Sequence, residues 1–202
     1  MGKLISIVGP SGVGKTTLVR VLAQMGKFAT AFEGHLERPF QSLFQQDRRF
    51  GLANQIDYFL MRAEQERELR TSPQIGLMDG GLDLDFHGFS RLFLHRNLLT
   101  EPEYDLLRRL YAFIRTTLPR PELFVRLVAD EETVAARLST RDRINIAGSQ
   151  DTQVFNSFLN KWLASLPHEK VLPLEVSHET EAYVSSVNTI LEYINLDDTF
   201  VK

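Results

Sequence analysis

The sequence predicts an α/β fold in which helices cover both faces of a parallel sheet of about five strands. Short apolar runs alternate along the 202 residues with longer stretches of helical periodicity. Because parallel strands need crossover connections, strands separated by helices indicate a sheet between two helical layers. The length and the absence of a linker or repeat favour a single domain over residues 1–202.

Each strand is predicted from a short apolar run, and each helix from apolar residues three or four positions apart. The expected strands lie near residues 3–8, 28–33, 74–78, 122–129 and 170–176. The expected helices lie near residues 16–24, 49–70, 86–97, 102–117, 131–141, 154–166 and 180–194. Three acidic residues, Glu33, Asp79 and Asp130, fall at the carboxyl ends of strands, where ligands of parallel sheets bind.

A glycine-rich stretch between the first strand and the first helix predicts a phosphate-binding loop. Residues 9–17 read GPSGVGKTT, which fits the P-loop spacing of Gly, four residues, Gly, Lys and Ser/Thr. Glycines let several backbone N–H groups point at one anion, the lysine reaches the outer phosphates, and the threonine hydroxyl is the usual Mg²⁺ ligand. The predicted nucleotide-binding residues are Gly9, Ser11, Gly12, Val13, Gly14, Lys15, Thr16 and Thr17.

Composition excludes several classes of protein. A net charge of −3 gives no sign of a nucleic-acid surface, and the absence of cysteine excludes disulfides, a thiolate nucleophile and a Cys-based zinc site. The longest apolar runs are far shorter than a membrane span, and the N-terminal run leads into the phosphate loop rather than a signal-peptide cleavage site. The cytoplasm is therefore the expected location.

Among P-loop proteins, the sequence favours a small kinase. A guanine-reading Asn-Lys-x-Asp element is absent, because Asn160-Lys161 is followed by Trp162-Leu163 inside an amphipathic stretch. The chain has no ABC-type signature and is short for an AAA-type motor. Phosphoryl transfer to a bound acceptor needs a base, a carboxylate that helps to bind Mg²⁺, and positive charge over the γ-phosphate.

Candidates for all three parts are present. Glu33, after the second strand, is the candidate base, and Asp79, after the third, joins Thr16 as a candidate Mg²⁺ ligand. An arginine-bearing lid is expected over about residues 137–149, where arginines four positions apart share a helix face. The lid arginines are Arg137, Arg141 and Arg143.

These residues lead to a family resemblance. The chain resembles the deoxynucleoside kinases, particularly the short bacterial deoxyadenosine/deoxyguanosine kinase type. The similarity runs from the P-loop to the final strand, through the blocks GPSGVGKTT, FEGHLERPF, NQIDYFLMR, LMDGGLDLD, PELFVRL and RLSTRDR. The resemblance implies a P-loop kinase fold and a homodimer formed through helices flanking the sheet. It also implies transfer of phosphate from ATP, with Mg²⁺, to the 5′-hydroxyl of a nucleoside-like acceptor.

The resemblance also implies specific acceptor contacts. Glu33 matches the general base on the 5′-hydroxyl, and Gln55 matches the amide that hydrogen-bonds the base edge. Arg62 and Asp85 match a charged pair near the base, and Phe89 matches an aromatic residue that stacks on it.

Several positions depart from the family pattern. Gly80 stands where the family has an arginine near the 5′-oxygen, and Phe44 where it has a tyrosine near the sugar 3′-hydroxyl. Residues 143–146 read RINI and lack a glutamate that reaches the same hydroxyl. We therefore expect the site to hold the sugar differently or to accept another molecule, because a site without polar partners no longer rejects analogues lacking the matching group.

Two alternative functions stay open at this point. The first is a kinase of another small metabolite or of a nucleoside monophosphate, for which Arg38, Arg48 and Arg49 could bind the acceptor phosphate. The second is a catalytically silent kinase-like subunit that binds nucleotide and a protein partner. The P-loop and Glu33 argue against the silent subunit, whereas Gly80 argues for it.

Overall fold

The sheet is parallel throughout and has five strands, as the sequence predicts. The computed structural model describes residues 1–32, 38–139, 151–178 and 183–196. The strand order is β2-β3-β1-β4-β5. The strands are β1 (Leu4–Val8), β2 (Phe28–Ala31), β3 (Ile75–Asp79), β4 (Leu123–Val128) and β5 (Val171–Glu175).

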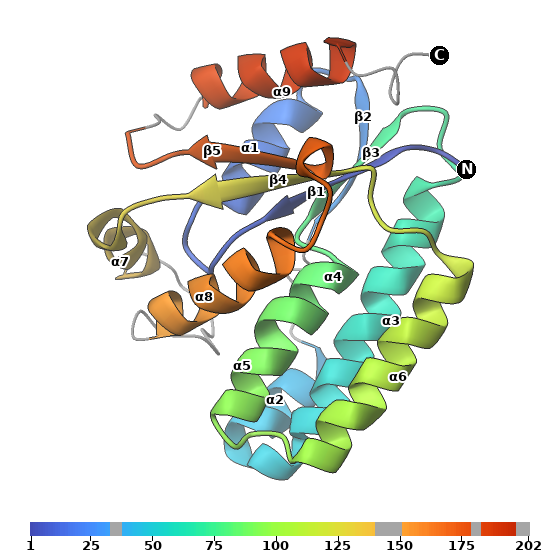
Figure 1. Ribbon diagram of the computed structural model, residues 1–202, viewed down its shortest axis with the longest axis vertical. Helices are drawn as coiled ribbons and strands as arrows, with labels where there is room; N and C mark the ends of the chain where they lie inside the picture. Colours follow the sequence, from blue (N-terminus) through green and yellow to red (C-terminus); the bar gives the residue numbers. More distant parts are fainter. Residues whose placement is uncertain (33–37, 140–150, 179–182, 197–202) are drawn as a thin grey trace.

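Helices occupy the connections between the strands (Figure 1). The α-helices are α1 (Lys15–Ala23), α2 (Pro39–Gln46), α3 (Gly51–Leu69), α4 (Leu82–Leu84), α5 (Arg91–His95), α6 (Glu101–Thr117), α7 (Glu131–Ser139), α8 (Thr152–Leu163) and α9 (Val184–Leu196). The segment η2 (Asp85–Ser90) is a turn of π-helix between α4 and α5, and η1 (Arg48–Phe50) and η4 (His168–Lys170) are 3₁₀ turns.

One helix, α2, was not predicted from the sequence. It has only eight residues, of which Phe44 alone is buried, although Phe40, Leu43 and Phe44 have the three- and four-residue spacing of one helix face. Pro39 begins the helix, where the fixed φ of proline and its missing N–H cost nothing. The strand expected over residues 28–33 ends earlier, at Ala31, and Glu33 lies outside the described residues.

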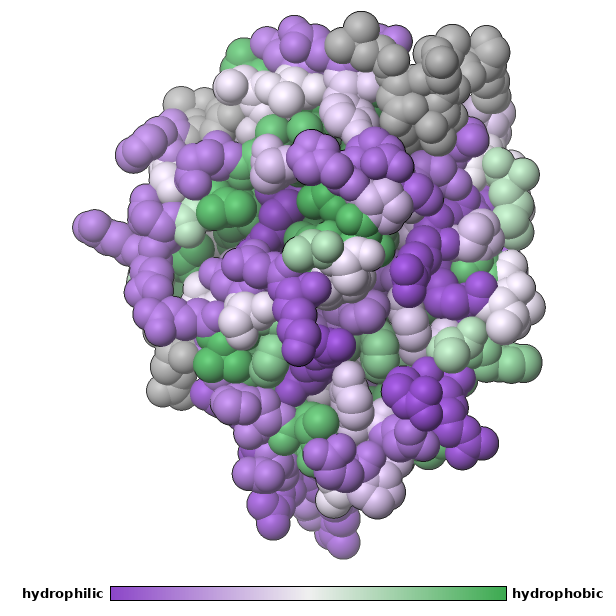
Figure 2. Space-filling view, in the orientation of Figure 1, coloured by the Kyte–Doolittle hydropathy of each residue, from purple (hydrophilic) through white to green (hydrophobic). Residues whose placement is uncertain are grey.

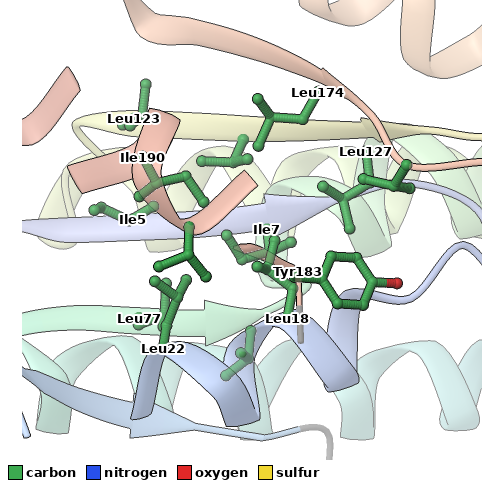
Figure 3. Close-up of a cluster of buried hydrophobic side chains, with 14 of the residues drawn as sticks. Ile5, Ile7, Leu18, Leu22, Leu77, Leu123, Leu127, Leu174, Tyr183 and Ile190 are labelled. Carbon is green, nitrogen blue, oxygen red and sulfur yellow. The ribbon is translucent and has the colours of Figure 1, made fainter. Parts of the chain in front are cut away.

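Alternation along the strands assigns each side chain to one of two helical layers. Ile5 and Ile7 of β1 pack with residues of α1 and α9 in one core cluster, which Figure 3 shows. Leu4 and Val8 point to the other face, where α3 and α8 supply the apolar partners. The chain therefore forms the three-layer arrangement that the sequence predicts (Figure 1).

The surface is largely polar on the face drawn in Figure 2, where hydrophobic residues form small separate patches. Among the residues that the structure describes, no helix combines the length and the hydrophobicity that crossing a bilayer demands.

A buried ionic network joins α3, α4 and α6. The Arg115 guanidinium on α6 donates to Glu66 Oε1 at 3.0 Å and also to Asp83, and both carboxylates are almost fully buried. Tyr111 Oη donates to Asp83 Oδ1 at 2.6 Å. Burial raises the pKa of Glu66, against the opposing effect of Arg115. The network fixes α4, which follows directly on the chain segment after β3.

We expect Arg115→Met to lower the free energy of unfolding by about 3–5 kcal/mol, because it leaves two buried carboxylates without their cation. Urea denaturation at neutral pH measures the change. Arg108→Met is the matched control on the same helix, since the exposed ion pair of Arg108 with Asp105 contributes at most about 1 kcal/mol. Equal losses in the two variants would contradict a special contribution from the network.

Candidate active site

The P-loop is enclosed by residues that follow it far along the chain. Gly12 and Gly14 have φ values of 81° and 108°, which favour glycine. A Cβ at Gly14 would lie 1.9 Å from the Tyr183 hydroxyl, and one at Gly12 would lie 2.7 Å from Cγ of Leu138. Both glycines are therefore required by close packing as well as by backbone conformation. Figure 3 shows the Tyr183 ring reaching toward this end of the sheet.

Arg137 hydrogen-bonds the backbone of the P-loop. Its Nη1 donates to the Val13 carbonyl at 2.9 Å and its Nη2 to the Val176 carbonyl at 3.1 Å. The first predicted lid arginine therefore joins the P-loop to the chain after β5. Arg141 and Arg143, the other two, lie outside the described residues.

The predicted metal ligands meet at the carboxyl edge of the sheet. Thr16 Oγ1 donates to Asp79 Oδ2 at 2.5 Å, while Asp79 Oδ1 is buried without a hydrogen-bond partner. Lys15 Nζ lies near the start of the loop, 2.9 Å from the Pro10 carbonyl. An unpaired carboxylate oxygen beside a hydroxyl fits Mg²⁺, which is commonly bound by one or two protein oxygens together with phosphates and water.

The described residues contain no group of three or more His, Asp or Glu side chains that could hold a metal ion. Any Mg²⁺ at Thr16 and Asp79 would therefore take most of its ligands from phosphates and water.

A second polar cluster gathers on η2 and α3. Arg62 Nε donates to Asp85 Oδ2 at 3.1 Å, and both side chains are almost fully buried. Ser90 Oγ donates to Gln55 Oε1 at 2.8 Å and to the Asp85 carbonyl at 3.0 Å. The structure thus brings together three of the predicted acceptor residues, and it adds Ser90. Turns of π-helix such as η2 often occur at functional sites.

Gly80 and Gly81 separate the two clusters. Ser6 Oγ donates to the Gly80 carbonyl, and the Gly80 N–H donates to Ile7 on β1 at 3.0 Å. Gly80 has a φ of 83°, and a Cβ there would lie 3.1 Å from Arg62 Nη2. The guanidinium of Arg62 therefore lies beside the position at which the sequence lacks the expected arginine.

The two predicted aromatic residues pack in apolar surroundings. Phe44 lies 8% exposed against Phe93, with ring centroids 5.1 Å apart. Phe89 is partly exposed and lies 4.8 Å from the Phe155 ring. Their predicted contacts with an acceptor stay predictions.

Burial keeps two titratable groups near η2 neutral. It lowers the pKa of His87 to about 3, aided by neighbouring arginines, and the His87 ring stacks on Trp162 at 4.8 Å. Burial also raises the pKa of Tyr111, and the Asp83 carboxylate adds to this shift. Neither group suits a general base near pH 7, where an effective base has a pKa close to the working pH.

Comparison with known proteins identifies the family. A model of the family "Deoxynucleoside kinase" matches residues 5–197. The chain belongs to this family. Its members are phosphotransferases that use nucleotide phosphate donors.

Two named kinases illustrate the similarity in sequence. A deoxyadenosine/deoxycytidine kinase of Bacillus subtilis (strain 168) is 29% identical over 146 residues, which are 69% of this chain and 66% of that protein. A deoxyadenosine kinase of Dictyostelium discoideum is 25% identical over 143 residues, or 70% of this chain and 58% of that protein. Each match thus spans less than two thirds of the relative's length.

Solved structures of the family share the fold over nearly the full length. Deoxyadenosine kinase from M. mycoides with bound dATP superposes with a TM-score of 0.78 at 16% identity, covering 94% of this chain and 99% of that one. The same enzyme with bound dCTP gives a TM-score of 0.77 at 15% identity, covering 94% and 98% of the two chains.

Sequence reasoning missed several residues around this candidate site. Tyr183 has a positive φ of 48°, which is uncommon for a residue with a side chain, but no local pattern links it to the P-loop. Ser90 and Gln65 are common polar residues on helices, and their contacts depend on the packing of η2 and α3. Gln65 accepts from Arg62 Nη1 at 3.2 Å and donates to the Phe32 carbonyl at 2.9 Å.

We expect Asp79→Asn to raise the Mg²⁺ concentration for half-maximal ATP turnover about tenfold or more, because a neutral amide binds a hard cation poorly. A Mg²⁺ titration of ADP formation measures the effect. Asp130→Asn is the matched control, since that strand-end carboxylate is exposed and accepts from Thr133 N at 2.7 Å. Unchanged Mg²⁺ dependence in Asp79→Asn would remove Asp79 from the metal site.

Proposed function

We propose that this protein transfers the γ-phosphate of ATP, with Mg²⁺, to the 5′-hydroxyl of a nucleoside-like acceptor. One observation carries the proposal. A phosphate-binding cluster around Thr16 and Asp79 is joined through Gly80-Gly81 to a buried polar cluster around Gln55 and Asp85. Adjoining sites for phosphates and for a polar ring are what a nucleoside kinase requires.

Each part of the reaction has a proposed residue. Lys15 holds the β- and γ-phosphates, and Glu33 accepts the proton of the attacking hydroxyl. Thr16 and Asp79 would hold Mg²⁺, which would supply positive charge to the phosphates. The remaining cations, which stabilise charge on the transferred group, are Arg137, Arg141 and Arg143.

Acceptor recognition is proposed for the η2 cluster. Gln55 presents a donor and an acceptor side by side, and Ser90 fixes its orientation by donating to Oε1. The Arg62–Asp85 pair lies beside it, and Phe89 offers a ring face. The named relatives are kinases of deoxyadenosine, deoxyguanosine and deoxycytidine, which supports a deoxynucleoside or a close analogue as acceptor. Phe44 leaves the sugar without one hydroxyl partner, which supports an altered sugar preference.

The contacts of two arginines favour a nucleoside over a nucleoside monophosphate. Arg38 forms a two-pronged ion pair with Asp57, which raises the pKa of Arg38. Arg49 is paired with Asp47 at 2.6 Å. Both were candidates to bind an acceptor phosphate, and both already contact a carboxylate.

A homodimer in the cytoplasm is part of the proposal. Exposed apolar residues lie on α3 and α6, the two long helices that run side by side in Figure 1. Leu106 and Phe113 are 44% and 70% exposed and are seven residues apart on α6, while Leu60 on α3 is 50% exposed. Aromatic residues such as Phe113 are enriched at subunit interfaces, which supports an interface on these helices.

We expect Glu33→Gln to lower kcat roughly 10²- to 10⁴-fold while the KM for ATP changes little, because the amide cannot accept the hydroxyl proton. ADP formation with a panel of deoxynucleosides, ribonucleosides, 3′-modified nucleosides and monophosphates measures the rates. Glu37→Gln is a control in the same segment. Efficient turnover by Glu33→Gln would remove Glu33 as the base. A wild-type protein that binds ATP but turns over no member of the panel would favour the silent subunit.

We expect Phe113→Glu to convert the proposed dimer to a monomer, because a charge would be buried in an apolar interface. Light scattering after size exclusion at micromolar concentration gives the mass. Val184→Glu is the control, since Val184 is 60% exposed on α9, across the sheet from α6. A monomeric wild-type protein, or a dimeric Phe113→Glu variant, would contradict this interface.

A further inference from the structure

Asn54 on α3 is a buried amide that the protein itself does not satisfy. Its side chain has 0% exposure, and neither Oδ1 nor Nδ2 has a hydrogen-bond partner in the described structure. More than nine in ten buried polar groups of native proteins are hydrogen-bonded, and leaving one unpaired is costly. An amide with both ends unpaired therefore needs an explanation.

The location of Asn54 supplies one. Its neighbour in sequence, Gln55, is the amide of the η2 cluster and shares a helix flank with Arg62. Asn54 lies on the adjoining flank with Tyr58 and Gln65, one and three turns along. Tyr58 Oη donates to Gln41 on α2 at 3.2 Å, and Gln65 donates to the Phe32 carbonyl after β2. Gln55 thus lies on the flank of α3 toward η2, and Asn54 lies on the flank toward α2 and the end of β2.

Three other polar side chains of α3 near Asn54 have partners. Gln55 accepts from Ser90, Gln65 contacts both Arg62 and Phe32, and Arg62 is paired with Asp85. The unsatisfied Asn54 amide is therefore next in sequence to Gln55, whose own hydrogen bond is satisfied by Ser90. A ligand that supplies the missing hydrogen bonds is one explanation for such a group.

We propose that Asn54 is a specificity-determining residue that hydrogen-bonds the acceptor base together with Gln55; this rests on the function proposed above. An amide complements a ring nitrogen next to an exocyclic amino or carbonyl group. Two amides on adjoining flanks of α3 suit a base with polar groups on two edges. A purine has such groups at N7 as well as on its pairing edge, whereas a pyrimidine carries a carbon-bound hydrogen or methyl group on the second edge. A purine nucleoside is therefore the inferred acceptor.

The test uses Asn54→Leu, a change of similar size that removes both polar atoms. We expect the KM for deoxyadenosine or deoxyguanosine to rise about tenfold or more, with a smaller change for deoxycytidine. In the absence of acceptor we expect Tm to rise by about 2–4 °C, because an apolar side chain replaces an unpaired buried amide. A purely structural amide would give the opposite result, a lower Tm and an unchanged KM.

Two further variants keep the test decisive. Leucine at position 54 could disturb the packing of α3, so Asn54→Ser, which is smaller and remains polar, is the second variant. We expect it to raise the KM for the purine nucleosides as well. Asn156→Leu on α8 is the matched control, because the Asn156 amide is satisfied: its Oδ1 accepts from Arg126 Nη2 at 2.6 Å. We expect this variant to lower Tm and to leave the KM unchanged.

The outcomes separate this inference from the proposed function. Wild-type phosphorylation of purine nucleosides, with an unchanged KM or a lower Tm in Asn54→Leu, overturns the role of Asn54 alone and points to a buried water as its partner. A wild-type protein that prefers pyrimidine nucleosides overturns the purine assignment. If no nucleoside is phosphorylated and none raises the Tm of the wild-type protein, the proposed function itself fails.

Discussion

The parallel pairing of β1 with β3 is the constraint on which the site depends. The register sets Ile7 opposite Asp79, so β3 ends beside the strand that leads into the P-loop. Thr16 then meets Asp79 through one hydrogen bond, although the two residues are far apart in sequence. The same register places Gly80 against β1. After Gly80 and Gly81 the chain continues through α4 into η2, which carries part of the proposed acceptor cluster. One strand pairing thus aligns the two polar clusters that form the proposed phosphate and acceptor halves of the site.

Local patterns in the sequence were sufficient to predict much of this arrangement. The five strands and the P-loop carry strong short-range signals, since a buried parallel strand is a continuous apolar run and the loop has fixed spacing. The contacts of Tyr183 with Gly14 and of Arg115 with Asp83 connect distant segments, and the residue types alone do not indicate them. The helix α2 was missed because it has only eight residues, although Phe40, Leu43 and Phe44 have helical spacing. Glu33 was predicted from its place after a strand, and Arg141 and Arg143 from their position in the expected lid, and the family resemblance agreed with these assignments. All three lie outside the described residues.

The interior treats its buried polar groups in two ways. In the scaffold, Arg115 donates to Glu66 and Asp83 and Tyr111 donates to Asp83, although Arg115 Nε has no partner. Near the proposed active site, Asp79 Oδ1 and the Asn54 amide are buried without partners. Unpaired polar atoms reduce stability, and those of Asp79 and Asn54 lie where ligands of the proposed site could complete their hydrogen bonds.

The packing of Tyr183 and Arg137 on the P-loop has a consequence for how the chain matures. The loop is synthesised first, at residues 9–17, but Arg137 binds it to the carbonyl of Val176 and the Tyr183 hydroxyl fills the space at Gly14. A ribosome must therefore release the last strand and the start of α9 before the earliest motif gains its full set of neighbours. A nascent chain halted before that point carries the complete nucleotide-binding sequence without the packing that shapes it.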